Sequence, residues 1–379
     1  MASVVWQSLH KHLLDSVLER LESPKDYLHF SIVCKWWYSV AKDNYNPRAK
    51  VTTPVLLLIQ TAKRGTWSLC DVMQNKVLDF HVQVPNVRFC GSSKGWLIYV
   101  DKDSVVTLVN PFFRVKRTRK KENSIIRLPP LISGVPPLKN WDSSISYYFA
   151  YKAILSADPV LCADNYIVVV ICEVYCQLAF IRPGKDTTWT FVADSRHIIE
   201  DVVPVEDEFY GVDQGRRNLV AFDTSAQYKC NVILDVGNTE EAPAKRYLVD
   251  LNEKRFLMVE RYGNVIDGRR MTYQFRIFEM KSHKCEWTEI YDLGDVALFV
   301  GDNSSIALAA SKYSGCQPNC IYFYHDNISQ GAFQPMKSHD FGVYNVKDQS
   351  FSQPYPEDIM TLMQLTSRPP IWVERPFKL

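Results

Sequence analysis

Residues 91–100 read Gly91-Ser92-Ser93-Lys94-Gly95-Trp96-Leu97-Ile98-Tyr99-Val100, a glycine-bounded turn followed directly by an apolar strand. The first five residues also fit the G-x-S-x-G pattern of a hydrolase nucleophile, with Ser93 in the central place. That pattern marks a nucleophile only where a strand, a sharp turn and a helix follow one another. Here a strand follows the turn, and no paired His and acidic residue stand at matching spacing. The stretch therefore predicts a turn that enters a β-strand, and it argues against an α/β hydrolase.

Similar segments fill the chain from Thr53 onward. The clearest are apolar or alternating runs between Gly, Pro, Asn and Asp clusters, at residues 55–60, 96–100, 167–172, 256–260, 273–279 and 321–325. No comparably clear helix interrupts them, which argues against βαβ units and favours an all-β meander. A pair of β-sandwiches without circular closure is the alternative arrangement.

The strand clusters group into about six units of the size of propeller blades, at residues 53–84, 88–128, 146–194, 197–236, 245–292 and 295–355. A short pattern around Trp67, Trp189 and Trp287 recurs at intervals of 122 and 98 residues, which accommodate whole numbers of such units. Residues 371–373 are expected to return to the first unit and close the ring, so that no long strand edge stays exposed. We predict an all-β propeller of six blades over residues 53–375, with seven as the alternative.

The segment before residue 50 differs from the rest of the chain in its glycine and proline content and in the spacing of its apolar residues. All 15 glycines lie at or after Gly65, and only two of the 20 prolines precede Pro54. Apolar residues recur at helical spacing over residues 10–22, and Ser23-Pro24-Lys25-Asp26 is typical of the start of a second helix. Two such short helices carry more apolar surface than they can bury against each other. We predict a small all-α domain over residues 5–46, covered in part by a partner or by another domain.

Composition excludes several function classes. The 44 Lys and Arg nearly balance the 42 Asp and Glu, and the net charge of +2 lacks the basic excess of a nucleic-acid or membrane binder. The sequence shows no signal-like N-terminus and no apolar run near the ~18 residues that span a membrane. It also shows no phosphate loop, dinucleotide fingerprint or H-E-x-x-H helix. We therefore expect no cofactor, no nucleic-acid or membrane partner, and a location in the cytoplasm, the nucleus or both.

Two local segments are candidate interaction sites. The densest basic cluster is typical of a nuclear localisation signal or of a solvated loop, and it contains Arg114, Lys116, Arg117, Arg119, Lys120 and Lys121. The proline-rich stretch 129–144 carries Trp141 and is a candidate loop for binding a target protein.

The cysteines are expected to be reduced. Cys172 and Cys176 stand four residues apart, as do Cys316 and Cys320. Zinc sites usually show tighter pairs with further His or Cys ligands, so we predict no metal site here. Small buried thiols account for these residues.

The helical N-terminus resembles an F-box. The resemblance rests on Leu9, Leu13-Leu14, Val17-Leu18, Leu21, Pro24-Lys25-Asp26 and Val33-Cys34-Lys35-Trp36-Trp37, the last of which matches the family's Val-Cys-Lys-x-Trp signature. The chain departs from the family at His10, where Pro is usual, and at His12, where an acidic residue is customary. The resemblance implies binding to a Skp adaptor, and the residues expected to contact it are Leu9, Leu13, Leu14, Leu18, Leu21, Ile32, Val33, Cys34 and Trp37.

From residue 88 to the end, the chain resembles the β-propeller of plant F-box proteins of the KIB type. The segments that carry this resemblance lie at residues 91–96, 108–112, 127–131, 152–159, 178–184, 209–213, 294–301 and 315–323. The resemblance implies a non-catalytic substrate receptor of a Skp–cullin–F-box ubiquitin ligase, whose propeller selects an unidentified target for ubiquitination and degradation. Two alternatives stay open. One is a propeller scaffold with a degenerate F-box, and the other is a propeller hydrolase with acidic residues in its central channel.

Overall fold

The structure is a computed structural model, and not every residue is described in it. The described residues are 9–18, 20, 30, 33–43, 51–52, 55–61, 66–74, 76–83, 87–111, 125–131, 150–160, 162–172, 178–192, 198–205, 208–213, 218–222, 230–234, 242–252, 255–266, 269–281, 286–324, 340–352, 355, 357–365 and 369–374.

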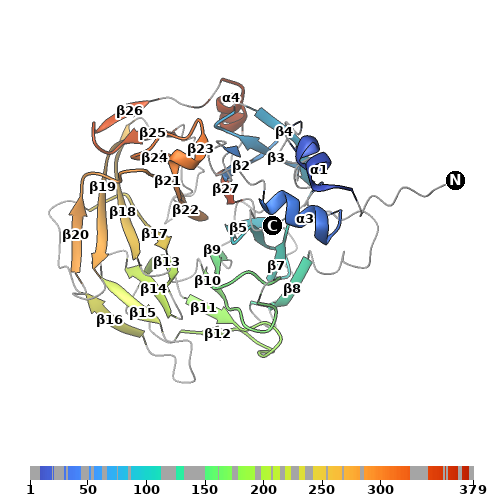
Figure 1. The fold of residues 1–379 in the computed structure, drawn as a ribbon. Helices are drawn as coiled ribbons and strands as arrows, with labels where there is room; N and C mark the ends of the chain where they lie inside the picture. Colours follow the sequence, from blue (N-terminus) through green and yellow to red (C-terminus); the bar gives the residue numbers. More distant parts are fainter. Residues whose placement is uncertain are drawn as a thin grey trace.

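Six sheets stand around a central axis as the blades of a propeller (Figure 1). From the inner to the outer strand, blade 1 contains β27 (Ile371–Glu374), β2 (Val55–Gln60), β3 (Thr66–Asp71) and β4 (Lys76–Gln83). Blade 2 contains β5 (Arg88–Ser93), β6 (Trp96–Val100), β7 (Val105–Val109) and β8 (Ile125–Pro130). Blade 3 contains β9 (Ala150–Leu155), β10 (Val168–Cys172), β11 (Leu178–Ile181) and β12 (Thr190–Phe191).

The second half of the ring holds the longest strands. Blade 4 contains β13 (Ile199–Val205), β14 (Glu208–Asp213), β15 (Leu219–Phe222) and β16 (Cys230–Leu234). Blade 5 contains β17 (Lys245–Asn252), β18 (Arg255–Ile266), β19 (Arg269–Lys281) and β20 (Glu286–Ile290). Blade 6 contains β22 (Ser304–Ala309), β21 (Val296–Gly301), β24 (Cys320–Phe323), β25 (Gly342–Asn345) and β26 (Ser350–Ser352). The six predicted units correspond to these six blades, and the sandwich alternative is excluded.

The C-terminal strand closes the ring. β27 pairs antiparallel with β2, with Val55 opposite Glu374 and Leu58 opposite Ile371. It also touches β5 of blade 2 and β22 of blade 6, so that it lies innermost in blade 1. The predicted return of residues 371–373 is confirmed, since β27 supplies the strand that the N-terminal part of blade 1 lacks.

Blade 6 departs from the predicted meander. Its inner strand β22 follows β21 in the chain, and β21 runs parallel to β24. A short helix, α4 (Glu357–Leu365), then precedes β27, and its Ile359 and Met363 are buried in the cluster between blades 6 and 1. The prediction that no clear helix interrupts the strands was wrong at α4. With nine residues, α4 is shorter than the window in which helical periodicity is reliably recognised.

Burial on both faces explains why the inner and central strands are almost entirely apolar. β10 reads Val-Val-Val-Ile-Cys and is buried at every position, as expected for a strand covered by neighbouring blades on both sides. The recurring Trp pattern, by contrast, does not occupy the same strand position in each blade. Trp67 lies on the third strand of blade 1, whereas Trp287 lies on the fourth strand of blade 5.

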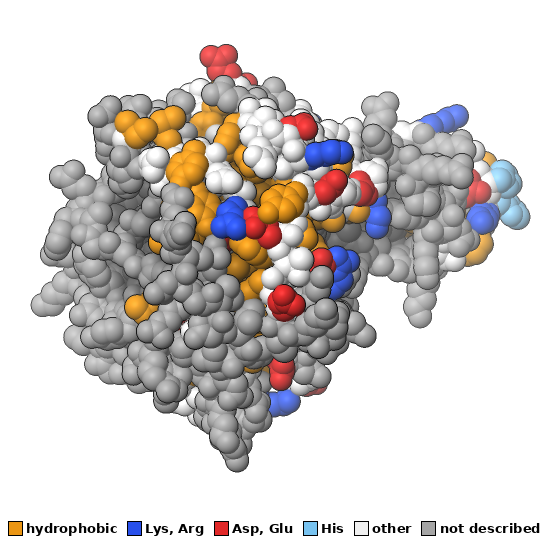
Figure 2. Space-filling view, turned by 90° about the vertical axis from the view of Figure 1, so that its left-hand side faces the viewer, with side chains coloured by type: hydrophobic (Ala, Val, Ile, Leu, Met, Phe, Trp, Pro, Cys, Tyr) orange, Lys and Arg blue, Asp and Glu red, His pale blue; other side chains and the backbone are white. Residues whose placement is uncertain are grey.

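Two helices are described in the N-terminal segment: α1 (Lys11–Leu18) and α3 (Lys35–Asp43). They lie in front of one flat face of the ring in Figure 1 and stand out from that face at the right of Figure 2. α1 falls inside the helix predicted over residues 10–22, and the predicted helix start at residues 23–26 is outside the described residues. Among the described residues, none of the helices has the length and apolar character to cross a membrane.

Candidate functional site

The helix pair has a small core of its own. Leu14, Leu18, Phe30, Val40 and Ala41 form one buried cluster. The Trp36 indole Nε1 donates a hydrogen bond of 2.9 Å to the Leu9 carbonyl oxygen, which ties α3 to the start of α1. The rings of Phe30 and Trp37 pack with their centroids 4.6 Å apart. The two helices therefore pack together through their own side chains.

A second set of apolar side chains, on the same helices and in the bend just before α3, faces solvent. Leu13 is 45% exposed, Val17 42%, Val33 49% and Trp36 42%. Leu13 and Val17 stand four residues apart on α1, so they share one face of the helix. Four large apolar side chains at this level of exposure, on a pair of helices that stands away from the ring, form a surface suited to a protein partner.

The residues predicted to contact the adaptor differ in how far the structure exposes them to solvent. Leu14 and Leu18 are buried in the helix core, and Leu13 and Val33 are exposed. Three others, Leu9, Cys34 and Trp37, are partly buried, and Leu21 and Ile32 lie outside the described residues. The sequence prediction did not include Val17 or Trp36. Their exposure follows from which side of each short helix packs inward, and helical spacing alone does not decide that.

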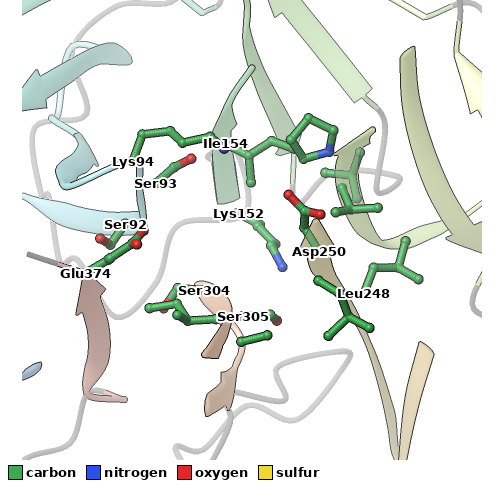
Figure 3. Close-up of a pocket in the computed structure, with 16 residues that line it drawn as sticks. Ser92, Ser93, Lys94, Lys152, Ile154, Leu248, Asp250, Ser304, Ser305 and Glu374 are labelled. Atoms are coloured by element: carbon green, nitrogen blue, oxygen red, sulfur yellow. The ribbon is translucent and has the colours of Figure 1, made fainter. Parts of the chain in front are cut away.

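A second candidate site lies at the centre of the ring. A cavity of about 240 Å³ is lined by residues from the inner strand of every blade, and Figure 3 shows its walls. One side carries Ser92, Ser93, Lys94 and Glu374 from blades 2 and 1, together with residues 304–307 of blade 6. Aliphatic side chains line the other side: Ile154, Val202, Val203, Leu248 and Leu251.

The Gly91–Gly95 motif lies at this cavity and forms the turn that its sequence predicts. Ser93 pairs with Trp96 across a two-residue turn, in which Lys94 and Gly95 have φ values of 53° and 81°. Such left-handed pairs are typical of tight β-hairpins. The Ser93 hydroxyl accepts a hydrogen bond of 3.0 Å from the Leu155 backbone N–H of blade 3. Ser93 therefore links two blades.

Ionic contacts join the inner strands of blades 3, 4 and 5 beside the cavity. Asp201 forms an ion pair with Lys152, and both side chains are nearly fully buried. The other oxygen of Asp201 accepts a hydrogen bond of 2.9 Å from the Leu248 backbone N–H. One carboxylate on blade 4 thus contacts both neighbouring blades.

A second buried group adjoins the first. The Arg246 guanidinium contacts Glu200 at 3.4 Å and Glu260 at 3.1 Å. Burial raises the pKa of Glu200 above its ordinary value, and the nearby Lys245 and Arg246 oppose that rise only in part. The Glu200 carboxyl therefore holds its proton more strongly than a solvated one.

Of the cysteines discussed from the sequence, Cys172 and Cys320 are buried, Cys316 is partly buried, and Cys176 lies outside the described residues. Burial raises the pKa of the Cys70 and Cys316 thiols to about 12 in each case, which keeps them protonated. In the described part of the chain no group of three or more His, Cys, Asp or Glu residues is placed to hold a metal ion. Cys320 is buried at the start of β24, as its predicted role as a small hydrophobe requires.

Two predicted interaction segments cannot be placed in the fold. The basic residues of the cluster 114–121 and the candidate target-binding residue Trp141 all lie outside the described residues. The nuclear localisation signal and the target-binding loop stay predictions.

Fold and helix pair together define a class: a six-bladed β-propeller preceded by a short helical segment. Comparison with known families gives a more specific assignment, because the model of the KIB1-4 beta-propeller matches residues 69–345. The chain belongs to this family. The resemblance stated from the sequence segments is thereby confirmed.

Relatives that align over nearly the whole chain are plant F-box proteins. F-box protein SKIP23 of Arabidopsis thaliana is 23% identical, with 98% of this chain and 96% of that protein aligned. F-box protein At4g35733 of the same plant is 24% identical, with 92% of this chain and 96% of that protein aligned. These alignments include the N-terminal segment as well as the propeller, which is consistent with a plant F-box protein that carries a KIB-type propeller.

Proposed function

We propose that this protein is the substrate-receptor subunit of a Skp–cullin–F-box E3 ubiquitin ligase. In this proposal the helix pair binds the Skp adaptor, and the propeller binds a target protein that is then ubiquitinated and degraded. The observation that carries it is the exposure of four large apolar side chains, Leu13, Val17, Val33 and Trp36, in a helical segment whose core is already filled by other side chains. The F-box names of the relatives support the same partner.

The exposed face is large enough to matter energetically. Burying a Val or Leu side chain completely is worth about 1.5–3 kcal/mol, and these side chains are already about half buried. Trp is among the residues that most often dominate the energy of an interface. Burial of four such side chains in one apolar groove of the adaptor would stabilise the complex.

The mechanism is positional. The adaptor and cullin would hold the receptor near the ubiquitin-carrying enzyme, and the propeller would raise the effective concentration of the target's lysines there. No residue of this chain needs to act as a catalyst. We place this activity in the cytoplasm, the nucleus or both, with residues 114–121 as the proposed import signal.

The test is co-purification of the full chain with a Skp adaptor and cullin from plant cells. We expect Leu13→Asp with Val17→Asp to remove the adaptor, because both side chains are exposed on one face of α1 and neither belongs to the buried cluster. Val77→Asp is the matched control, since Val77 is 41% exposed on the propeller. Thermal unfolding of all variants should match that of the wild-type chain.

Two outcomes would contradict the proposal. One is recovery of the adaptor with the double variant at the wild-type level. The other is a folded wild-type chain that recovers no adaptor, which would favour the scaffold alternative connected with His10 and His12.

Affinity purification with and without a proteasome inhibitor then identifies the target, as a protein enriched only when degradation is blocked.

A further inference from the structure

We propose that the projecting end of the β18–β19 hairpin in blade 5 is a binding surface for a target segment that combines apolar and acidic side chains. This inference rests on the proposed receptor role and adds to it the surface and the chemistry of the partner. β17 pairs with β18 only as far as Arg261, and β20 pairs with β19 only as far as Ile277. The hairpin residues beyond these points therefore extend past both neighbouring strands of their blade.

Three large apolar side chains are exposed on this projecting end. Met271 is 57% exposed, Ile266 54% and Tyr273 40%. Among the described residues, the outer strands β4, β8, β12 and β26 each carry a single exposed large apolar side chain: Val77, Ile125, Phe191 and Phe351. Single exposed apolar residues are ordinary on a protein surface, whereas a group of them marks an interaction site. The hairpin end is such a group.

A β-bulge brings the three side chains to one side of the hairpin. Met271 pairs with Asn264, which stands two residues from Ile266, so Met271 and Ile266 lie on the same side. Tyr262, two residues before Asn264, shares that side. The bulge follows Tyr262 and shifts the register by one residue at Tyr273, whose ring centroid lies 6.4 Å from that of Tyr262. Bulges commonly redirect a side chain in this way.

The other side of the hairpin is held against blade 6. Thr272 donates to the Asp340 carboxylate through its backbone N–H at 3.1 Å and through its hydroxyl at 2.7 Å. The fully buried Arg261 guanidinium donates to the same carboxylate at 2.7 Å and to the Tyr324 carbonyl oxygen at 2.8 Å. These bonds fix the base of the projecting end, so a partner that binds it has little ordering entropy to overcome.

The charges at the tip favour an acidic partner. The turn and the start of β19 contain Arg269 and Arg270 against one acidic residue, Asp267. In the ladder, Arg269 pairs with Ile266 and Arg270 pairs with Val265, so both arginines stand next to the exposed apolar positions. Acidic groups of a partner would gain from this excess of positive charge. A second copy of the chain, packed on the same surface about a two-fold axis, would instead bring two positive tips together.

The tip lies at the face of the ring away from the entry of the N-terminal segment. β2 is the first blade strand after that segment, and β18 holds the same place in blade 5 that β2 holds in blade 1. Because equivalent strands of a propeller run in the same direction, β18 ends at the face opposite to the one where β2 begins. A target segment bound at the tip would therefore not cover the face at which the N-terminal segment enters.

The test uses three pools of synthetic peptides and the immobilised full chain. Each peptide has about 12 residues, enough to cross the projecting end of the hairpin when extended. The acidic pool mixes Leu, Ile, Val and Phe with Asp and Glu, the basic pool mixes the same apolar residues with Lys and Arg, and the polar pool mixes Ser and Gly with Asp and Glu. We expect the acidic pool to be retained about tenfold more strongly than either other pool, the ratio expected for two exposed charge contacts or two partly buried apolar side chains.

Two double variants locate the surface. Ile266→Ser with Met271→Ser should weaken retention of the acidic pool about tenfold by removing two exposed apolar side chains. Arg269→Glu with Arg270→Glu should reverse the preference, so that the basic pool is retained more strongly than the acidic pool. Ile125→Ser is the matched control, because Ile125 is 51% exposed on β8 of blade 2.

The same variants separate this inference from the ligase role. Both hairpin variants should recover the Skp adaptor at the wild-type level and should lose the protein that is enriched when degradation is blocked. A wild-type chain that recovers no adaptor contradicts the ligase role, whereas the peptide pools test the hairpin surface without any adaptor.

Three results would overturn the inference. The first is equal retention of the acidic and basic pools by the wild-type chain. The second is unchanged retention of the acidic pool by the variant Ile266→Ser with Met271→Ser. The third is a wild-type chain that is a dimer by light scattering and becomes a monomer in that variant, which would assign the surface to a second copy.

Discussion

Aromatic rings close the propeller at one junction, whereas buried charges join its blades at another. Between blades 6 and 1, Trp372 is fully buried, and its ring centroid lies 5.0 Å from that of Phe299 and 5.6 Å from that of Tyr324. Between blades 3, 4 and 5, the contact is the Asp201 carboxylate with Lys152 and the Leu248 N–H. We call the first the closing junction and the second the ionic junction.

Chain connectivity explains the difference. Blades 3, 4 and 5 follow one another in the chain, so short connections already hold them near each other. The closing junction packs Val55 and Leu57 of β2 in one cluster with Phe299 and Trp372, so it holds together segments near the two ends of the chain. Fixing a loop of that length costs roughly 5 kcal/mol of entropy. Burial of large aromatic side chains contributes a large free energy of folding and tolerates small displacements of the rings. It therefore suits a junction whose two sides are not held together by a short connection in the chain. An ion pair adds directional contacts and so fits blades that are already adjacent.

The largest expected effect comes from breaking the closing junction. Trp372→Ala removes a fully buried indole and its hydrogen bond of 3.1 Å to the Val300 carbonyl oxygen. We expect the free energy of unfolding to fall by about 3–5 kcal/mol, as for other buried large-to-small changes. Urea unfolding followed by tryptophan fluorescence and circular dichroism measures it.

The control for this variant is Phe351→Ala. Phe351 is 42% exposed on β26 and contacts the rings of Tyr344 and Phe323 away from β27. We expect it to cost about 1 kcal/mol. Equal losses in the two variants would show that the junction has no special role.

The second effect tests the ionic junction. Asp201→Asn leaves the buried Lys152 ammonium without a carboxylate, although the amide oxygen can still accept the Leu248 N–H. We expect a loss of about 2–4 kcal/mol, since removing one partner of a buried pair leaves an uncompensated charge. The same urea experiment measures it.

A double replacement separates charge from packing. Lys152→Met with Asp201→Leu removes both charges, and we expect it to recover much of the loss, because apolar side chains of similar size often replace buried pairs without cost. A double variant as unstable as Asp201→Asn would show that the hydrogen bonds of Asp201 to Leu248 and Val202 matter more than the ion pair.

The ring could be predicted from sequence because its periodicity is local. Strands β2 and β6 fall at residues 55–60 and 96–100 as predicted, since turn residues bound both apolar runs. The return of Ile371-Trp372-Val373 was predictable from the edge that an open ring would expose. The order of strands in blade 6 was not, because the parallel pairing of β21 with β24 depends on contacts remote in the chain.

The candidate sites show the same limit. The resemblance to an F-box placed Leu13 and Leu14 together as adaptor contacts, but the structure leaves the first 45% exposed and the second fully buried. That choice depends on how α1 packs against α3. The cavity was unpredictable for a similar reason, because its residues come from six inner strands, between Ser92 and Glu374.

The smallest expected effect concerns pH and the Glu200 carboxyl near the ionic junction. Burial raises the pKa of Glu200, and the neighbouring Asp201 adds to the rise, while Lys245 and Arg246 oppose it. The folded state therefore holds this proton more strongly than the unfolded state does. The stabilisation is fully present below the unfolded pKa of about 4.5 and is lost as pH rises through the folded pKa.

Glu200→Gln removes this titration and keeps the shape of the side chain. We expect the stability of the variant, measured relative to the wild-type chain, to increase as the pH is raised from 4 to 7 in a series of urea titrations. Ser350→Ala, a change on the exposed strand β26 that involves no titratable group, is the control for the series. If the Arg246 contact outweighs the burial of Glu200, the slope for Glu200→Gln will have the opposite sign, and Glu200 will then belong with Asp201 as a charge that holds the blades together.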